Sequence, residues 1–148
     1  MPNNPLPPAA INRDAIAQRM ATIPAYQAFA FELLELKSGY AAVRVPRRLE
    51  YDGVFNSYHG GLMMTVADSC ACLAILTLAG AEAQVTTTDM NIRFLAPCLT
   101  AVTAKATLIK FGRTLCPVAV DLFDDAGIKV AVAQVNYIRL CPETAKKL

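Results

Sequence analysis

The chain has 148 residues, 55% of them hydrophobic, which predicts one domain with a sizeable core. Its 14 basic and 12 acidic side chains leave a net charge of +2, which gives no general electrostatic reason to expect binding to nucleic acid or to an acidic membrane surface. Five cysteines without metal-ligand spacing do not indicate a disulfide framework, and Cys70 and Cys72, inside an apolar run, are expected to be reduced core thiols.

Residues 1–10 contain four prolines and are predicted to form a flexible N-terminal arm. This arm lacks the charged and apolar regions of a signal peptide, so we expect a cytoplasmic protein. Residues 11–142 are predicted to form the single domain, and residues 143–148 a solvated C-terminal tail.

The first part of the domain is predicted to form two short helical segments and a hairpin. Asn12 is expected to cap a helix that ends near Met20, and Pro24 to begin a second helical turn. Two strand-like runs joined by a Lys-Ser-Gly turn predict an antiparallel hairpin, residues 29–36 and 40–45.

The central feature is an apolar stretch from residue 58 to residue 80 that opens with a His-Gly-Gly sequence. Its small residues predict a helix with close neighbours. Asp68 is the one charged side chain between His59 and Glu82. A buried aspartate is rare unless it is paired or has a function, so Asp68 is the first candidate for a site residue.

Residues 46–57 are predicted to be a loop that leads into this helix, with Ser57 as its N-cap. Gly60 and Gly61 leave the first backbone N–H groups of the helix unobstructed. Residues 62–79 are just long enough to span a bilayer, but they contain Asp68 and hydroxyl side chains, so we interpret them as the core helix of a soluble protein with no membrane contact.

After the helix, four runs rich in Val, Thr, Ile and Phe are separated by turn residues and predict strands over residues 84–95, 101–111, 115–123 and 128–140. Together with the hairpin they predict an α+β fold, in which an antiparallel sheet of five to six strands wraps around one long helix. The outer face of this sheet is expected to be apolar enough to favour a partner subunit.

The segment HGGLMMTVADSCACLA, residues 59–74, resembles the HGG and Ala-Asp element of hotdog-fold acyl-CoA thioesterases, in the PaaI-like branch of the 4-hydroxybenzoyl-CoA thioesterase superfamily. TTDMNIRFLAP, residues 87–97, resembles the strand that follows the central helix in that branch, and residues 111–113 (Phe-Gly-Arg) its next strand–turn. The resemblance covers roughly residues 23–139 and implies a hotdog fold.

The resemblance implies that the Gly60 N–H holds the thioester oxygen and that Asp68 is the catalytic carboxylate, as general base or as nucleophile. It assigns to Thr87 the hydroxyl that positions water, and to His59 mainly a hydrogen bond that fixes the helix start. A helix N-terminus also favours developing negative charge on physical grounds alone. The structural alternatives are tight packing at Gly60, a hydrogen-bond network at Asp68 and an ordinary strand residue at Thr87.

Relatives often carry Asn or Gln six positions before the histidine, where this chain has Gly53. The nearest amide is Asn56, three positions before His59. Either Asn56 replaces that amide or the amide is missing and turnover is weak.

Arg93 and Arg113 are the candidates for binding the phosphates of coenzyme A. The acyl group would be received by Tyr58, Leu62 and Met63, and Gly61 is a further candidate for binding the substrate.

Gly60 and Asp68 are eight residues apart, about 12 Å along a helix, so they cannot both reach one thioester carbon from one chain. The resemblance implies an acyl-CoA thioesterase that acts on an aryl- or fatty-acyl-CoA, and this separation predicts a homodimer or homotetramer. No metal and no cofactor beyond the coenzyme A of the substrate are expected. The alternatives are a hotdog domain that binds acyl-CoA or another apolar ligand without turnover, and a hotdog dehydratase or hydratase.

Overall fold

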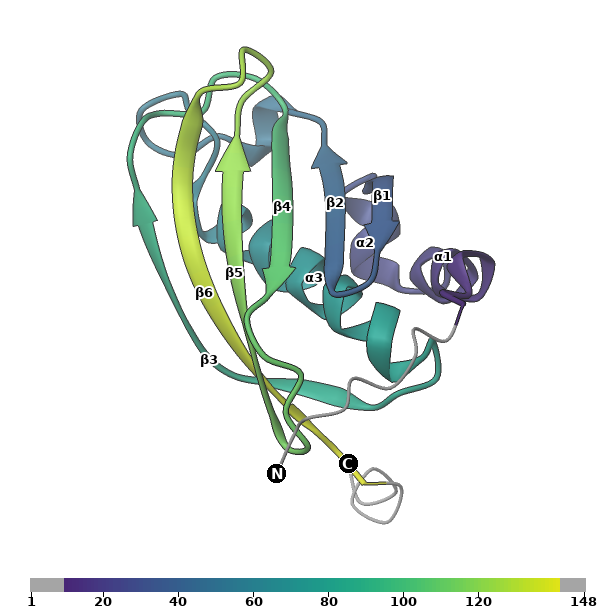
Figure 1. Ribbon diagram of the computed structural model, residues 1–148. Helices are drawn as coiled ribbons and strands as arrows, with labels where there is room; N and C mark the ends of the chain where they lie inside the picture. The colour runs from purple at the N-terminus through teal and green to yellow at the C-terminus, as the bar shows by residue number, and fades with distance from the viewer. Residues whose placement is uncertain (1–9, 142–148) are drawn as a thin grey trace.

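A six-stranded antiparallel sheet curves around one long helix in the computed structural model, which describes residues 10–141 (Figure 1). The helices are α1 (Arg13–Ala21), α2 (Pro24–Ala28), a short 3-10 turn (Leu49–Tyr51) and α3 (Gly60–Ala79). The strands are β1 (Glu32–Lys37), β2 (Tyr40–Val45), β3 (Val85–Phe94), β4 (Val102–Leu108), β5 (Leu115–Phe123) and β6 (Lys129–Arg139). The predicted α+β class is confirmed.

The strand order in the sheet is β1-β2-β4-β5-β6-β3. The β1–β2 hairpin and the β4–β5–β6 meander pair neighbours in sequence, whereas β3 crosses to the far side and pairs with β6. β1 and β3 are therefore the two edges of the sheet. The β3–β6 pairing is interrupted between Thr87 and Asp89, where β3 carries an irregularity in register.

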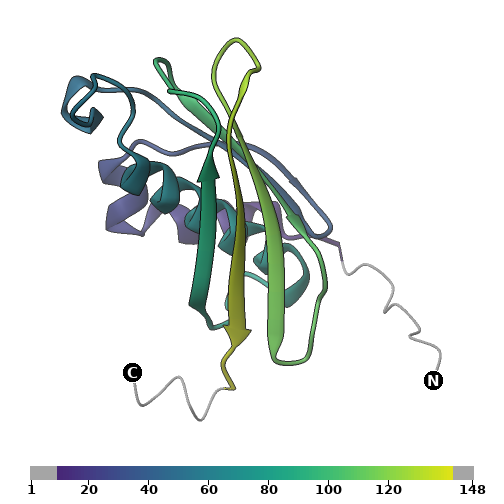
Figure 2. The ribbon, with the colours of Figure 1, turned by 90° about the vertical axis from the view of Figure 1, so that its left-hand side faces the viewer.

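The core lies between α3 and the concave face of the sheet (Figure 2). On β5, the alternating residues Val118, Val120 and Leu122 are buried against it, as their period of two predicts. On α3, small residues let the helix approach the strands so closely that the Cys70 thiol contacts the carbonyls of Ala41 at 3.4 Å and Ala104 at 3.5 Å.

α3 is long and apolar enough to cross a membrane, with 20 residues and a mean hydropathy of 1.9. It packs against the sheet instead, and ten of its residues are buried there. This arrangement is that of a core helix, as the sequence predicts.

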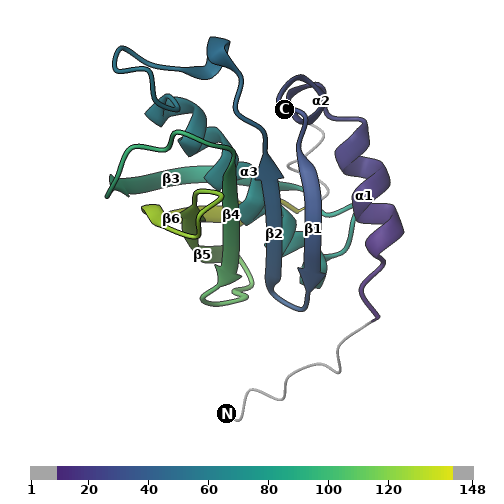
Figure 3. The ribbon, with the colours of Figure 1, turned by 90° about the horizontal axis from the view of Figure 1, so that it is seen from above.

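The N-terminal helices lie beside the β1 edge of the sheet (Figure 3). The predicted cap of α1 is confirmed, since the Asn12 side chain accepts a hydrogen bond from the Ala15 N–H at 3.0 Å. Arg19, near the end of α1, donates to the carbonyls of Ala81 and Ala83 and so ties α1 to the segment that follows α3.

Three local predictions are wrong. The hairpin begins at Glu32 rather than at Phe29, because Phe29 ends α2 and Ala30 adopts a left-handed φ of 52°. The N-cap of α3 is His59 rather than Ser57. The segment predicted as loop before α3 contains the 3-10 turn.

The outer face of the sheet is more polar than expected, because several outward positions carry charged or amide side chains, among them Lys105, Asp121, Gln134 and Asn136. Residues 1–9 of the predicted arm and all of the predicted tail lie outside the described residues.

Candidate active site

The start of α3 is capped by His59, whose Nδ1 accepts a hydrogen bond from the Gly61 N–H at 3.0 Å. The His59 carbonyl accepts from the N–H groups of Leu62 and Met63 at 3.0 and 3.1 Å. The Gly60 N–H, in contrast, has no acceptor among residues 10–141. The helix thus begins with one unused donor at its positive end.

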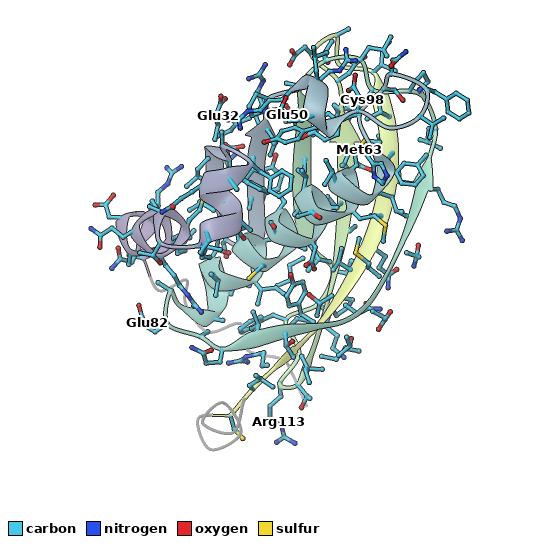
Figure 4. The ribbon with its side chains drawn as sticks, turned by 180° about the vertical axis from the view of Figure 1, so that it is seen from behind. Glu32, Glu50, Met63, Glu82, Cys98 and Arg113 are labelled. Atoms are coloured by element: carbon cyan, nitrogen blue, oxygen red, sulfur yellow. The ribbon has the colours of Figure 1, made fainter. Side chains whose placement is uncertain are left out.

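A cleft of about 390 Å³ opens at this end of α3, and its lining includes Tyr58, Gly60, Met63 and Phe94. We call it the helix-end cleft. A Cβ at position 60 would lie 2.8 Å from the exposed Phe94 ring, so any larger residue there has to displace that ring. Met63 and Cys98, which both line the cleft, lie at the same end of the molecule (Figure 4).

Two of the predicted substrate-binding residues, Tyr58 and Met63, line the helix-end cleft, whereas Leu62 and Gly61 do not. Tyr58 is 2% exposed, and its hydroxyl has no hydrogen-bond partner within residues 10–141. Burial raises the pKa of Tyr58 above its usual range, so this side chain stays a neutral phenol.

Asp68 lies two turns further along α3, on a half-buried face of the helix. Its Oδ1 accepts a hydrogen bond from the Thr87 hydroxyl at 2.8 Å and another from the Tyr137 hydroxyl at 2.7 Å. Thr87, which the resemblance assigns to positioning water, thus donates directly to the carboxylate. The hydrogen bond from Tyr137 to Asp68 was not predicted from the sequence.

Two further side chains lie near Asp68 on α3, and neither is bonded to its carboxylate. Tyr26 donates to the carbonyl of Ser69 at 3.1 Å, and Cys72 follows Asp68 by one helical turn. Burial raises the pKa of the Cys72 thiol to about 11, so at neutral pH it is not a nucleophilic thiolate. Cys70 and Cys72 are free thiols, buried and half-buried on α3, which agrees with the sequence prediction.

The loop that precedes α3 is held by Arg47. Its guanidinium bonds both carboxylate oxygens of Asp52 and donates to the carbonyls of Asn56 and Leu99. The hydrogen bonds from Arg47 to Asp52 lower the pKa of the Asp52 carboxyl group. The loop and the β3–β4 connection are thereby fixed to each other beside the helix-end cleft.

Within this loop, position 53 lies against His59, since a Cβ added to Gly53 would be 3.5 Å from His59 Cδ2. Asn56 has a left-handed φ of 54°, and its exposed side chain makes no hydrogen bond with any residue from 10 to 141.

The two predicted coenzyme A ligands lie apart in one chain. Arg93 is exposed on β3, next to Phe94 and the helix-end cleft. Arg113 is exposed at the opposite end of the sheet, far from Met63 (Figure 4), and close in register to the Tyr137 end of β6. Within residues 10–141, no three His, Cys, Asp or Glu side chains group as a metal site.

Comparisons with known proteins agree with this architecture. A family model described as thioesterase superfamily matches residues 55–131. A protein of Saccharolobus solfataricus named "Putative esterase SSO2140" is 31% identical over 106 residues, which are 71% of this chain and 74% of that protein.

Two solved structures share the fold. The PaaI protein of the E. coli phenylacetic acid degradation operon is 16% identical, with a TM-score of 0.80 over 90% of this chain and 97% of that one. A thioesterase family protein from Silicibacter pomeroyi is 23% identical, with a TM-score of 0.78 over 86% of this chain and 96% of that one. The predicted hotdog fold is confirmed.

Proposed function

The chain belongs to the thioesterase superfamily, a family of thioester hydrolases, and on this premise we propose that it hydrolyses an aryl- or fatty-acyl-coenzyme A to a free acid and coenzyme A. The observation that carries the proposal is the Asp68 carboxylate, half-buried on an apolar helix and held at 2.8 Å by the Thr87 hydroxyl. A carboxylate fixed in this way is suited to take a proton or to attack a carbonyl carbon.

The Gly60 N–H is the proposed donor to the thioester oxygen. In support, this N–H has no acceptor within residues 10–141, begins a 20-residue helix and borders the helix-end cleft. A donor already in place at the positive end of a helix stabilises the oxygen as it becomes negative, without reorganisation during the reaction.

Two routes lead to the same products. As general base, Asp68 takes a proton from water while the water oxygen bonds to the carbonyl carbon; the C–S bond then breaks, and the proton passes to the coenzyme A thiolate. As nucleophile, an Asp68 oxygen bonds to the carbonyl carbon and displaces the thiolate, and water hydrolyses the resulting anhydride. A thioester is already a reactive electrophile, so neither route calls for a metal or a further cofactor.

We propose that the site is shared between two chains. Gly60 and Asp68 are separated by about 12 Å along α3, too far for both to reach one carbon atom. Two antiparallel α3 helices would bring Gly60 of one chain opposite the partner's Asp68. The exposed edge strand β3 supports a homodimer, because an edge has unpaired backbone groups that a second chain can bind. A homotetramer built as a dimer of dimers would keep this pair.

A shared site also gives both arginines a role with coenzyme A. Arg93 lies near the Gly60 end of a chain and Arg113 near the Asp68 end. Two chains arranged head to tail would therefore bring Arg93 of one to the same site as the partner's Arg113. Guanidinium groups bind phosphates through paired N–H donors.

The second candidate function is binding of acyl-CoA without turnover. It is favoured by Gly53, which has no amide to offer beside His59. Thiol release from a panel of aryl- and fatty-acyl-CoAs separates the two functions: we expect hydrolysis of at least one member. Tight binding of acyl-CoA without thiol release would favour the second function, and hydration of an enoyl-CoA would indicate a hydratase.

A further inference from the structure

Tyr137 is a buried hydroxyl that contacts Asp68 twice. Its oxygen lies 2.7 Å from Asp68 Oδ1 and 2.8 Å from the Asp68 backbone carbonyl. The side chain is 4% exposed and comes from β6, 69 residues further along the chain. Burying a phenol hydroxyl costs free energy unless the hydroxyl makes a hydrogen bond, and here Asp68 supplies the acceptors.

The pairing of β3 with β6 explains how this contact arises. Thr87 and Tyr137 are opposite each other in register, and both side chains face α3. The irregularity directly after Thr87 leaves Thr88 and Asp89 both exposed, so Thr87 keeps its inward direction while the rest of β3 continues in register. Two hydroxyls from neighbouring strands therefore converge on one carboxylate.

Both hydroxyls bind the same oxygen atom, Oδ1. A carboxylate oxygen has two lone-pair directions, and Thr87 and Tyr137 approach both of them, the single phenol hydrogen of Tyr137 being shared with the Asp68 carbonyl. No residue from 10 to 141 donates to Oδ2. Burial raises the pKa of Tyr137 above its usual range, which keeps the phenol protonated as a donor.

We propose that Tyr137 is a positioning residue for the thioesterase reaction: with Thr87 it fixes the Asp68 carboxylate through Oδ1 and leaves Oδ2 as the oxygen that meets water or the thioester carbon. This inference rests on the proposed function, and it holds for either route of Asp68. Tyr137 acts through Asp68 and does not touch the reacting atoms.

The test compares Tyr137→Phe with the matched variant Tyr26→Phe. Each removes one buried phenol oxygen that is bonded to α3, but Tyr26 bonds only the carbonyl of Ser69 and not the carboxylate. We expect Tyr137→Phe to lower kcat at least about tenfold with little change in KM, since a misdirected catalytic group slows chemistry more than binding. Tyr26→Phe is expected to keep kcat within about twofold of the parent.

A kcat for Tyr137→Phe that equals that of Tyr26→Phe, or a loss confined to KM, would overturn the proposal. A crystal structure of Tyr137→Phe gives a readout that needs no substrate. The expected result is an Asp68 carboxylate in more than one orientation; a single orientation with Oδ1 still on Thr87 would overturn the proposal even if no acyl-CoA were hydrolysed. Failure of the parent on the whole substrate panel would instead refute the proposed function.

Discussion

Gly60 and Asp68 lie on the same helix, eight positions apart, which separates them by about 12 Å along its axis. The unused N–H of Gly60 and the carboxylate of Asp68 therefore cannot act on one thioester within one chain. If both act, each active site takes one of them from each of two chains.

Mixing two inactive variants tests this sharing. Gly60→Pro removes the N–H donor, and Asp68→Asn removes the base or nucleophile. In a mixed dimer, the site built from the intact Gly60 of one chain and the intact Asp68 of the other is complete. After subunit exchange we expect about a quarter of parent activity, since half of the dimers are mixed and one of their two sites works. Activity no greater than the sum of the separate variants, or a fully active monomer, would contradict the shared site.

The Gly60 N–H itself is tested by two substitutions at that position. Proline fits the first position of a helix, and His59 already has the extended backbone, φ −63° and ψ 130°, that a residue before proline prefers. Gly60→Pro is expected to lower kcat by about a hundredfold or more through loss of the donor. Gly60→Ala is the matched control, because its Cβ also displaces the Phe94 ring but it keeps the N–H. Equal losses in the two variants would show that crowding of the cleft, and not the donor, is responsible.

A substitution at Gly53 tests whether an added amide raises the activity. The φ of Gly53 is outside the left-handed region, and a Cβ there meets His59 at an ordinary contact distance of 3.5 Å, so neither the backbone nor the first side-chain atom opposes an asparagine. If an amide at this position helps to hold the substrate carbonyl or Asp68, Gly53→Asn will raise kcat/KM several-fold. Steady-state kinetics and a thermal melt together decide the outcome. An unchanged or lower kcat/KM in a folded variant would show that the amide is not what limits turnover.

The buried thiol of Cys70 is expected to lower the free energy of unfolding at alkaline pH. Burial raises the pKa of this thiol to about 12, above the value in the unfolded chain. A group whose pKa is raised on folding stabilises the fold fully at low pH and loses this contribution once the pH exceeds its unfolded pKa. We expect the stability difference between the parent and Cys70→Ala to shrink by about 2 kcal/mol from pH 9 to pH 11. Urea unfolding at each pH measures it, and a difference independent of pH would contradict the prediction.

The parts of the fold that the sequence predicts best are those with a strong local signal. The apolar run around Asp68 has no other charge and ends at Gly80, which takes the left-handed φ of 94° that favours glycine. The strand period of β5 is equally clear. The errors at Phe29 and Ser57 occur where local rules conflict, because phenylalanine favours strands but here ends a helix, and His59 caps where serine is the commoner choice.

Part of the candidate site can also be predicted from the sequence. Asp68 stands out by its charge, and the glycines before it by their place at a helix start. Tyr137 could not be found in this way, because its contact depends on the β3–β6 register and on the irregularity after Thr87. The polar outer face of the sheet was missed for a similar reason, since the direction of each side chain depends on register.

The central claim is that Asp68 performs the chemistry of thioester hydrolysis, and thiol release by the parent and by Asp68→Asn tests it most directly. Asparagine keeps the size of the side chain and an oxygen for Thr87 to bind, but it can act neither as base nor as nucleophile. We predict that the parent hydrolyses at least one acyl-CoA and that the folded variant loses about a hundredfold or more in kcat. A variant as active as the parent would contradict the mechanism.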